Sequence, residues 1–433
     1  MFVSSKRRLF WIVIAAASLL ACESPARHQT EATAVTLDND RLDAIIPALQ
    51  DEVDRGLRAG FVAGIVTRDG AQFTAAVGMA DRERGTQMRT DTRFRIASMT
   101  KPIVTAAIMQ LADKGVLALS DPVSLYIPAF SNTRVATSRE PDETGVIPTR
   151  APARAIEIRD LLNHTAGLGY VFDSSTTLDR MYLDANLFVT TGSLAERIDK
   201  IAKLPLYADP GTEWRYSYAT DVAGLVVEAA SGISLEAYLN KNLFKPLSMN
   251  DTEFFFDKSD FDRVAVVYEF TTDGRLVRAG ANEVAANLNE DGFGVISGGA
   301  GLVSSISDYL RFCQMMLRGG ELGGVRVLSA EAVRQMMSDQ LAPGASGLLW
   351  EHASSSFGYG GTVVLHPERA EGRAVAGEWG WSGLWDTWFV INPADGVAAV
   401  LLAQTQPWPE PPASRARDIV KAAAYEAVAA PAD

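Results

Sequence analysis

The sequence predicts an α/β fold in which strands from both ends of the chain share one antiparallel sheet. Three observations predict it. An amphipathic helix and two strand-like runs lie near the N-terminus, a helix-rich middle carries long Pro- and Gly-containing loops, and strand-like runs return before an Ala-rich terminal helix. We therefore expect an α/β subdomain from residues 38–120 and 295–433. Residues 121–294 are expected to form a mainly helical subdomain.

The N-terminal segment is typical of a secretory signal peptide, so we expect it to lie outside the fold. Basic residues at 6–8 precede an apolar run that is too short to span a bilayer. Cys22 then follows a small residue and resembles the cysteine of a bacterial lipobox. This implies a signal peptide over residues 1–21, a lipid on Cys22 and a tether over residues 22–37. An ordinary cleaved signal or an uncleaved anchor is the alternative.

A lipid on Cys22 would place the protein on the periplasmic side of a bacterial membrane. Glu23 is not the aspartate that usually retains lipoproteins in the inner membrane, so the outer membrane is favoured. Cys313 is the other cysteine of the chain, so lipidation of Cys22 would leave no intrachain disulfide.

Composition and charge restrict the class of partner. The chain has 433 residues, of which 47% are hydrophobic, and a formal net charge of −13. That length allows a large core, and the acidity without a basic stripe argues against nucleic acid. The four histidines form neither an H-x-H nor an HExxH pattern, so we expect no metal site and no cofactor.

The first elements can be placed from their periodicity. Apolar residues recur at helical spacing over residues 42–57, which predicts an amphipathic helix. Two strands are expected at Phe61–Thr67 and Gln72–Gly78. Asp69-Gly70 between them is a hairpin signal, so the two strands should pair.

The last elements follow the helix-rich middle. The strand-like runs are Phe357–Leu365, Trp379–Ile391 and Val397–Gln404. The turn residues at 392–396 predict that the last two runs form an antiparallel hairpin. An Ala-rich helix is expected from about Ser414 to Ala429.

Ser98-Met99-Thr100-Lys101 carries the main chemical signal. A serine and a lysine three residues apart at the start of a helix project from the same face, so an amine lies within reach of a hydroxyl. That is the minimum arrangement for a serine nucleophile activated by a lysine. The same pattern also occurs as a helix cap followed by a solvated lysine, so it needs support from elsewhere. The helix that follows is apolar on nearly every side up to Gly115, which predicts that it is buried.

Four further motifs give that support. They are Asp160–Leu168 (DLLNHTAGL), Trp214–Tyr218 (WRYSY), Ser297–Ser305 (SGGAGLVSS) and Gly380–Gly383 (GWSG). Together with the Ser98 helix they resemble the serine β-lactamase and penicillin-binding-protein superfamily, in the class C-like branch that includes the family VIII carboxylesterases. The resemblance covers roughly residues 40–425. It implies a β-lactamase-like fold, with a central antiparallel sheet flanked by the N- and C-terminal helices on one face and a mainly helical subdomain.

The resemblance also implies a role for each matched residue. Ser98 would be the nucleophile that forms an acyl-enzyme, and Lys101 would be its base. Lys101 must then spend time neutral, which requires burial or a nearby positive field. Tyr216 would shuttle a proton toward the leaving group and later activate water. The backbone N–H groups of Ser98 and Leu384 would stabilise the oxyanion.

Two departures from the family pattern narrow the substrate class. Trp381 stands where β-lactam-processing relatives hold the cation of K-T-G or H-x-G, and Tyr218 stands where they hold an amide-binding asparagine. Together with Ser382 and Gly383, these residues would contact the substrate. Their chemistry favours short acyl esters, so the resemblance implies a carboxylesterase-like serine hydrolase. The alternatives are a β-lactamase or D,D-peptidase-like amidohydrolase, and a non-catalytic binding lipoprotein of the same fold.

Other residues in these motifs have a structural interpretation. His164 begins a Thr-Ala-Gly turn and is expected to make a structural hydrogen bond rather than act as a base. Alternation along a strand would direct Trp379, Trp381 and Trp385 to one face. They would then either line an apolar acyl pocket or belong to the core.

Overall fold

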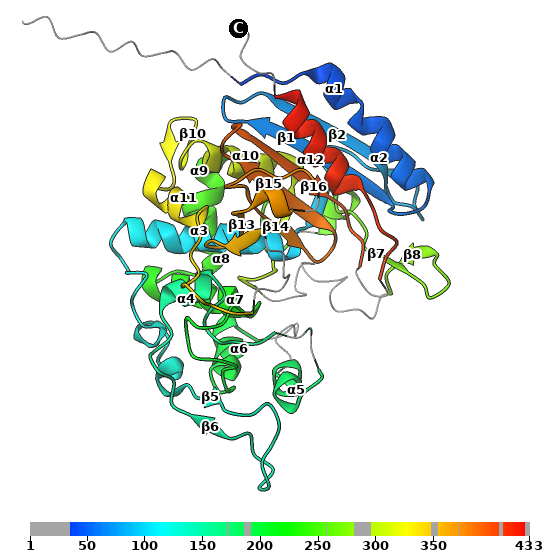
Figure 1. Cartoon of the computed structure of the whole chain (residues 1–433). Helices are drawn as coiled ribbons and strands as arrows, with labels where there is room; N and C mark the ends of the chain where they lie inside the picture. The colour runs from blue at the N-terminus through cyan, green and yellow to red at the C-terminus, as the bar shows by residue number, and fades with distance from the viewer. Residues whose placement is uncertain are drawn as a thin grey trace, which may run out of the picture. The chain divides into compact units, whose positions relative to one another are not determined.

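One antiparallel sheet organises the protein, and strands from both ends of the chain form it (Figure 1). Its strand order is β12-β13-β14-β15-β16-β1-β2-β3. The strands are β12 (Ser355–Phe357), β13 (Thr362–Val364), β14 (Trp379–Gly383), β15 (Thr387–Asn392), β16 (Val397–Leu402), β1 (Gly60–Thr67), β2 (Gln72–Asp81) and β3 (Thr86–Gln87). The predicted α/β architecture, with a central antiparallel sheet flanked by helices, is confirmed by these elements.

The structure is a computed structural model that describes residues 35–428, except 171, 173, 186–191, 257, 281–295, 348–353, 371 and 407–409. The described residues form one compact unit. The predicted signal peptide and Cys22 lie outside the described residues. No single helix of the described part is long and apolar enough to cross a bilayer, although Ala219–Ser231 and Leu235–Leu247 together reach that length with a 76° bend between them.

At the centre of the sheet, the first strand of the chain, β1, lies beside the last, β16. Strand β1 pairs with β2 on one side, as the Asp69-Gly70 signal predicts, and with β16 on the other, where Val62 lies opposite Leu402. All eight residues of β1 are buried, because helices cover both faces of the sheet there. A strand buried on both faces shows no alternation of polar and apolar residues.

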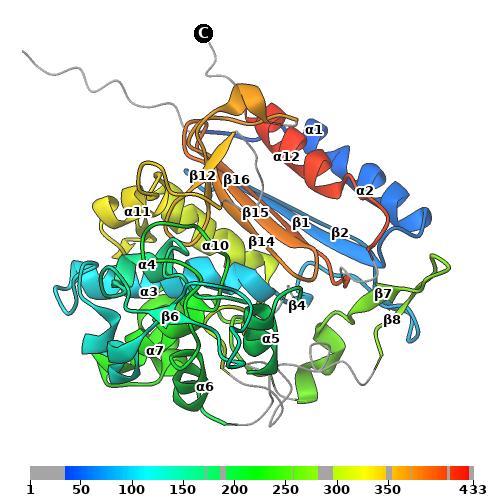
Figure 2. The ribbon, with the colours of Figure 1, turned by 60° about the horizontal axis from the view of Figure 1, so that its bottom comes forward.

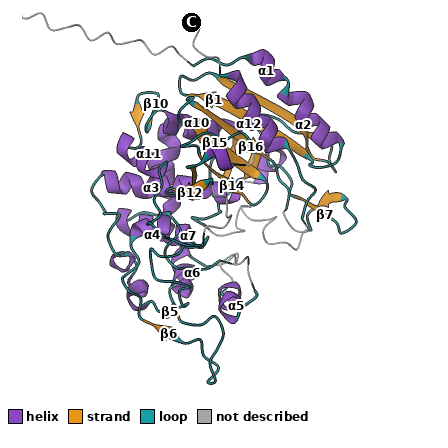
Figure 3. Ribbon diagram, in the orientation of Figure 1, coloured by secondary structure: helices purple, strands orange, loops and turns teal. Residues whose placement is uncertain are grey.

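The helices divide between the two faces of the sheet and the helix-rich middle (Figures 1–3). Helices α1, α2 and α12 pack on one face, and α10 packs on the other. The helices are α1 (Asn39–Asp43), α2 (Ile45–Asp54), α3 (Thr100–Asp113), α4 (Ile158–Leu162), α5 (Thr177–Asp184), α6 (Leu194–Ile201), α7 (Ala219–Ser231), α8 (Leu235–Leu239), α9 (Lys245–Leu247), α10 (Ile306–Leu317), α11 (Ala330–Met336) and α12 (Ala416–Ala427).

Short strand pairs lie outside the main sheet. They are β4 (Arg93–Arg95) with β9 (Val303–Ser305), β5 (Val135–Ala136) with β6 (Thr149–Arg150), β7 (Tyr268–Phe270) with β8 (Leu276–Arg278), and β10 (Glu321–Leu322) with β11 (Val325–Arg326). The β4–β9 pair matters for the site, because β4 leads directly into the Ser98 motif.

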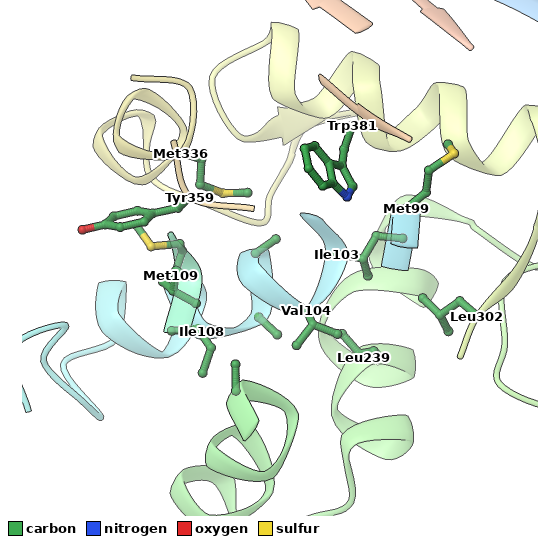
Figure 4. Close-up of a cluster of buried hydrophobic side chains, with 14 of the residues drawn as sticks. Met99, Ile103, Val104, Ile108, Met109, Leu239, Leu302, Met336, Tyr359 and Trp381 are labelled. Carbon is green, nitrogen blue, oxygen red and sulfur yellow. The ribbon is translucent and has the colours of Figure 1, made fainter. Parts of the chain in front are cut away.

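Helix α3 is the central helix that its composition predicts. Every residue from Thr100 to Leu111 is buried. Its apolar side chains lie in the main hydrophobic core, where Ile103 and Val104 are surrounded by side chains from α8, from the segment before β9 and from β14 (Figure 4). The helix packs against α7, so it joins the sheet side of the core to the helix-rich middle.

Three segments differ from the sequence predictions. Ser98 lies in a 3₁₀ turn, Ala97–Met99, that ends directly before α3 begins at Thr100. The run predicted at Trp379–Ile391 is two strands, because the chain reverses between β14 and β15. The run predicted at Phe357–Leu365 is also two strands, β12 and β13. Gly360, at φ +79°, lies in the turn between them, where a residue with a side chain would be strained.

Candidate active site

Ser98 lies on a tight turn that its neighbours hold in place. Ala97 has φ +46°, an unusual conformation for a residue with a side chain. The turn is fixed from both sides, since Ile96 N–H donates to the carbonyl of Leu302 at 3.0 Å and Leu302 N–H donates to Thr100 Oγ1 at 3.1 Å. The Ser98 side chain is half-buried and therefore reachable, while both flanking residues are buried.

The structure brings Ser98, Lys101 and Tyr216 together. Ser98 Oγ accepts a hydrogen bond from Lys101 Nζ at 3.2 Å and another from Tyr216 OH at 2.7 Å. Lys101 Nζ also donates to the carbonyl of Gly299 at 2.7 Å. The lysine is 1% exposed, so protein atoms rather than bulk water surround its amine. When Lys101 is neutral, the hydroxyl of Ser98 can donate to it instead.

Asp221 supports this arrangement, and the sequence did not single it out. It lies in the first turn of α7 and is buried. Its Oδ1 accepts from Ser297 Oγ at 2.6 Å and from Gly299 N–H at 3.2 Å, so it fixes the loop whose Gly299 carbonyl accepts the hydrogen bond from Lys101. A Cβ on Gly299 would lie 2.5 Å from Asp221 Oδ2 and 3.5 Å from Lys101 Nζ, which explains the need for glycine.

His164 packs behind Tyr216. Its ring centroid lies 4.9 Å from that of Tyr216, and its Nδ1 lies 3.2 Å from Ser217 Oγ. Burial, with a contribution from the nearby Lys101 charge, holds the pKa of His164 well below its usual range. The imidazole therefore stays neutral. It makes a structural hydrogen bond, in agreement with its interpretation from the sequence.

A cavity of about 340 Å³ opens at Ser98. Tyr216 and the β14 residues Trp381, Ser382 and Gly383 line it, and Leu384 follows at its edge. Strand β14 passes close to the nucleophile turn, since a Cβ on Gly383 would lie 2.3 Å from the carbonyl oxygen of Ile96. Glycine at 383 therefore allows Leu384 to approach Ser98. Three charged residues that the sequence did not indicate also line the cavity: Arg58, Asp386 and Arg417.

Trp381 and Tyr218 occupy different surroundings. Trp381 is 6% exposed and lies between the rings of Tyr216, at 5.4 Å, and Phe357, at 5.2 Å, so it forms an apolar wall of the cavity. Tyr218 is 2% exposed, packs 4.4 Å from the ring of Tyr170 and does not line the cavity.

The expectation that Trp379, Trp381 and Trp385 share one face is wrong for Trp385. Trp379 and Trp381 alternate on β14 and belong to the main core. Trp385 lies in the turn after β14 and packs in a separate cluster with Ala97 and Val267. The reversal of the chain at residues 384–386 breaks the strand alternation on which the expectation depends.

Comparisons with known proteins agree with this geometry. A family model described as Beta-lactamase matches residues 43–424. Esterase EstB of Burkholderia gladioli is 33% identical over 393 residues, which cover 86% of this chain and 93% of EstB. Monacolin J acid methylbutanoyltransferase of Aspergillus terreus is 27% identical over 347 residues, which cover 75% of this chain and 79% of that enzyme.

Solved structures show the same likeness. EstCE1, described as a hydrolase with promiscuous acyltransferase activity, superimposes with a TM-score of 0.70 at 26% identity and covers 89% of this chain and 98% of its own. Unliganded simvastatin synthase (LovD) of Aspergillus terreus superimposes with a TM-score of 0.71 at 25% identity, and the match covers 90% of this chain and 98% of that enzyme. The matched segment contains the Ser98–Lys101–Tyr216 cluster, and the chain therefore belongs to the beta-lactamase family of serine hydrolases.

Proposed function

We propose that the protein is a carboxylesterase that hydrolyses short acyl esters through an acyl-enzyme on Ser98. The observation that carries the proposal is the pair of hydrogen bonds on Ser98 Oγ, from Lys101 Nζ and Tyr216 OH, at the floor of an open cavity. One partner can remove the serine proton, and the other can deliver a proton to a departing alcohol. The relatives EstB and EstCE1 are named an esterase and a hydrolase, which supports this chemistry.

The proposed reaction has two steps. Ser98 Oγ attacks the ester carbonyl while its proton passes to neutral Lys101, and the carbonyl π electrons move to the oxygen. Backbone N–H groups of Ser98 and Leu384 stabilise this oxyanion. The C–O bond to the alcohol then breaks as the proton reaches the leaving oxygen through Tyr216. In the second step water repeats the attack on the acyl group and regenerates Ser98.

The apolar wall formed by Trp381 supports neutral esters as substrates. A cation in its place would form a charge-assisted hydrogen bond to a substrate carboxylate, worth about 1.5–3 kcal/mol. This free energy corresponds to roughly ten- to a hundred-fold in rate. Trp381 instead offers an indole face between the rings of Tyr216 and Phe357. We therefore expect efficient hydrolysis of short neutral esters and slow hydrolysis of cephalosporins, whose carboxylate finds no cation on β14.

A paired assay tests the function. Wild-type protein is expected to turn over a short p-nitrophenyl ester far faster than a chromogenic cephalosporin. The Trp381→Lys variant should gain about tenfold in cephalosporin acylation and lose ester turnover, because the new ammonium attracts the carboxylate and polarises the apolar wall. Trp381→Met is the matched control, since its side chain has a similar length and no charge.

The possible outcomes separate the alternatives. Equal turnover of ester and cephalosporin by the wild-type protein would favour the amidohydrolase alternative. If the folded wild-type protein turns over neither substrate, the result would favour a binding protein without catalytic activity. Gains of the same size in the lysine and methionine variants would show that loss of the indole, and not the added charge, changes the specificity.

We further propose that the esterase is exported and held on the periplasmic side of a membrane by a lipid on Cys22. The Leu-Leu-Ala-Cys pattern at residues 19–22 supports this location. The Cys22→Ser variant is expected to lose acylation and to leave the membrane fraction, because a single serine hydroxyl cannot be lipidated by the same thioether chemistry. Fractionation and metabolic labelling with a radiolabelled fatty acid measure this. Wild-type protein that is exported but wholly soluble would contradict the anchor.

A further inference from the structure

The turn between β14 and β15 has an unusual residue at its most demanding position. Gly383 pairs with Thr387, so three residues, Leu384, Trp385 and Asp386, form the hairpin loop. Asp386 has φ +65°. Three-residue hairpin loops commonly end with a residue in this left-handed region, where glycine is preferred because it has no side chain to strain. An aspartate there suggests that its carboxylate is needed.

The carboxylate of Asp386 joins two distant parts of the chain. Oδ2 accepts from Arg58 Nε at 2.6 Å, and Oδ1 accepts from Arg417 Nη2 at 2.8 Å. Arg58 precedes β1 and Arg417 lies in the first turn of α12. Arg58 is 6% exposed and its Nη1 also donates to the carbonyls of Leu57 and Pro412, at 2.5 and 3.2 Å. The hairpin tip is thus fixed to both terminal segments of the fold.

The other loop residues bind the hairpin to the nucleophile turn. Trp385 packs against Ala97, the residue before Ser98. The carbonyl of Trp385 accepts from Thr405 N–H at 3.0 Å, and Thr387 Oγ1 donates to the carbonyl of Ile96 at 3.2 Å. Leu384 lies between these anchors and at the edge of the Ser98 cavity. Its backbone orientation therefore depends on how firmly the loop is held on each side.

We infer that Asp386 is a positioning residue, whose ion pairs with Arg58 and Arg417 hold the hairpin so that the Leu384 N–H points at the oxyanion. The inference rests on the proposed function. Catalytic donors must be held within about 0.5 Å of their productive position. A preorganised donor stabilises the transition state without reorganising during the reaction, so a loosened loop loses part of that stabilisation. The strained backbone conformation of Asp386 persists because the ion pairs with the two arginines stabilise it.

Two variants separate positioning from general stability. Asp386→Gly removes the ion pairs and relieves the strain at φ +65°, but it leaves the buried Arg58 without its carboxylate, so its melting temperature should fall and the assays are run well below it. Its kcat/KM on a short neutral ester should fall about ten- to a hundred-fold, mainly in kcat, since removal of a whole oxyanion donor costs about 10²–10³. Asp386→Asn tolerates the same φ and keeps a neutral acceptor, so its loss should be smaller.

A transition-state analogue gives a readout that a structural role would not change. The affinity for a trifluoromethyl ketone, which forms a tetrahedral oxyanion on Ser98, should fall by the same factor as kcat/KM in Asp386→Gly. The affinity for the product carboxylic acid should change little. Ser248→Gly is the matched control, because Ser248 also has a positive φ, at +53°, but is exposed at the end of α9. It should keep both kcat and analogue affinity.

Each possible result either supports or contradicts the positioning role of Asp386. Unchanged kcat and unchanged analogue affinity in Asp386→Gly would overturn it, and so would a loss of activity that only follows a loss of folded protein. If the wild-type protein hydrolyses no ester at all, the proposed function fails instead. Binding of the ketone would then still report on the hairpin, because the ketone requires only the nucleophile and the oxyanion donors.

Discussion

Ser98→Ala is expected to abolish ester turnover while the protein stays folded. Loss of the nucleophile removes the covalent path, and in serine hydrolases such a loss costs on the order of 10⁶ in kcat. The structural cost is small by comparison. Lys101 keeps its hydrogen bond to Gly299, and Tyr216 loses one partner at the wall of an open cavity that water can enter. We therefore expect a loss of about 1–3 kcal/mol in unfolding free energy at most.

Covalent labelling and thermal unfolding measure the two parts of this expectation. A fluorophosphonate probe should label the wild-type protein once per chain and leave the Ser98→Ala variant unlabelled, while both unfold in one cooperative transition. Stoichiometric labelling of the variant would show that another hydroxyl is the nucleophile. Ser382, which also lines the cavity, would then be the residue to test.

Lys101→Arg is expected to be nearly as inactive as Lys101→Ala. Arginine keeps the positive charge but does not release its proton in a protein, so it cannot act as a base toward Ser98. The site is also sterically unsuitable, since Lys101 is 1% exposed and its amine already lies 2.7 Å from the Gly299 carbonyl. We expect losses of at least about 10²-fold in kcat/KM for both variants, the scale of general base catalysis.

The control lies at the C-terminal end of the same helix. Lys114 follows the last turn of α3 and is exposed, so Lys114→Arg should leave kcat/KM unchanged. Small primary amines should partly rescue Lys101→Ala, because a neutral amine can occupy the emptied space, and they should not rescue the arginine variant. An arginine variant with most of the wild-type activity would make Lys101 an electrostatic anchor and require a different base.

The sequence predicted the structure correctly wherever one local pattern determines it. The Asp69-Gly70 signal predicted the β1–β2 hairpin, and the apolar surround of residues 103–111 predicted that α3 is central. The three-residue spacing of Ser98 and Lys101 predicted their hydrogen bond, although Ser98 lies in a 3₁₀ turn just before the helix. Each of these inferences depends on neighbours within one turn or one hairpin, where spacing alone brings side chains together.

The residues that the sequence did not indicate act through distant partners. In the sequence Asp221 is an ordinary acidic residue in the first turn of a helix. Its role becomes visible only in the structure, where the loop at Ser297–Gly299 binds it. Leu384-Trp385-Asp386 contains no glycine, proline or asparagine, and Asp386 is its one residue of a type that favours turns, so the turn signal is weak. In the folded protein Arg58 and Arg417 bind Asp386 in this turn, and neither arginine is near it in the sequence. Such contacts are apparent only in the folded chain.

The place of β16 in the sheet has a consequence for the order of folding. Strand β16 lies between β15 and β1, so β1 lacks one neighbour until the last part of the chain is available. Pairings between residues as distant as Val62 and Leu402 close a very long loop, and contacts of this kind form late and slowly. A nascent chain that already contains Ser98, Lys101 and Tyr216 still lacks the hairpin that carries Leu384 and the helix that carries Arg417. Assembly of the site therefore waits for residues 384–417, and hydrolytic activity is expected only after the ribosome has synthesised them.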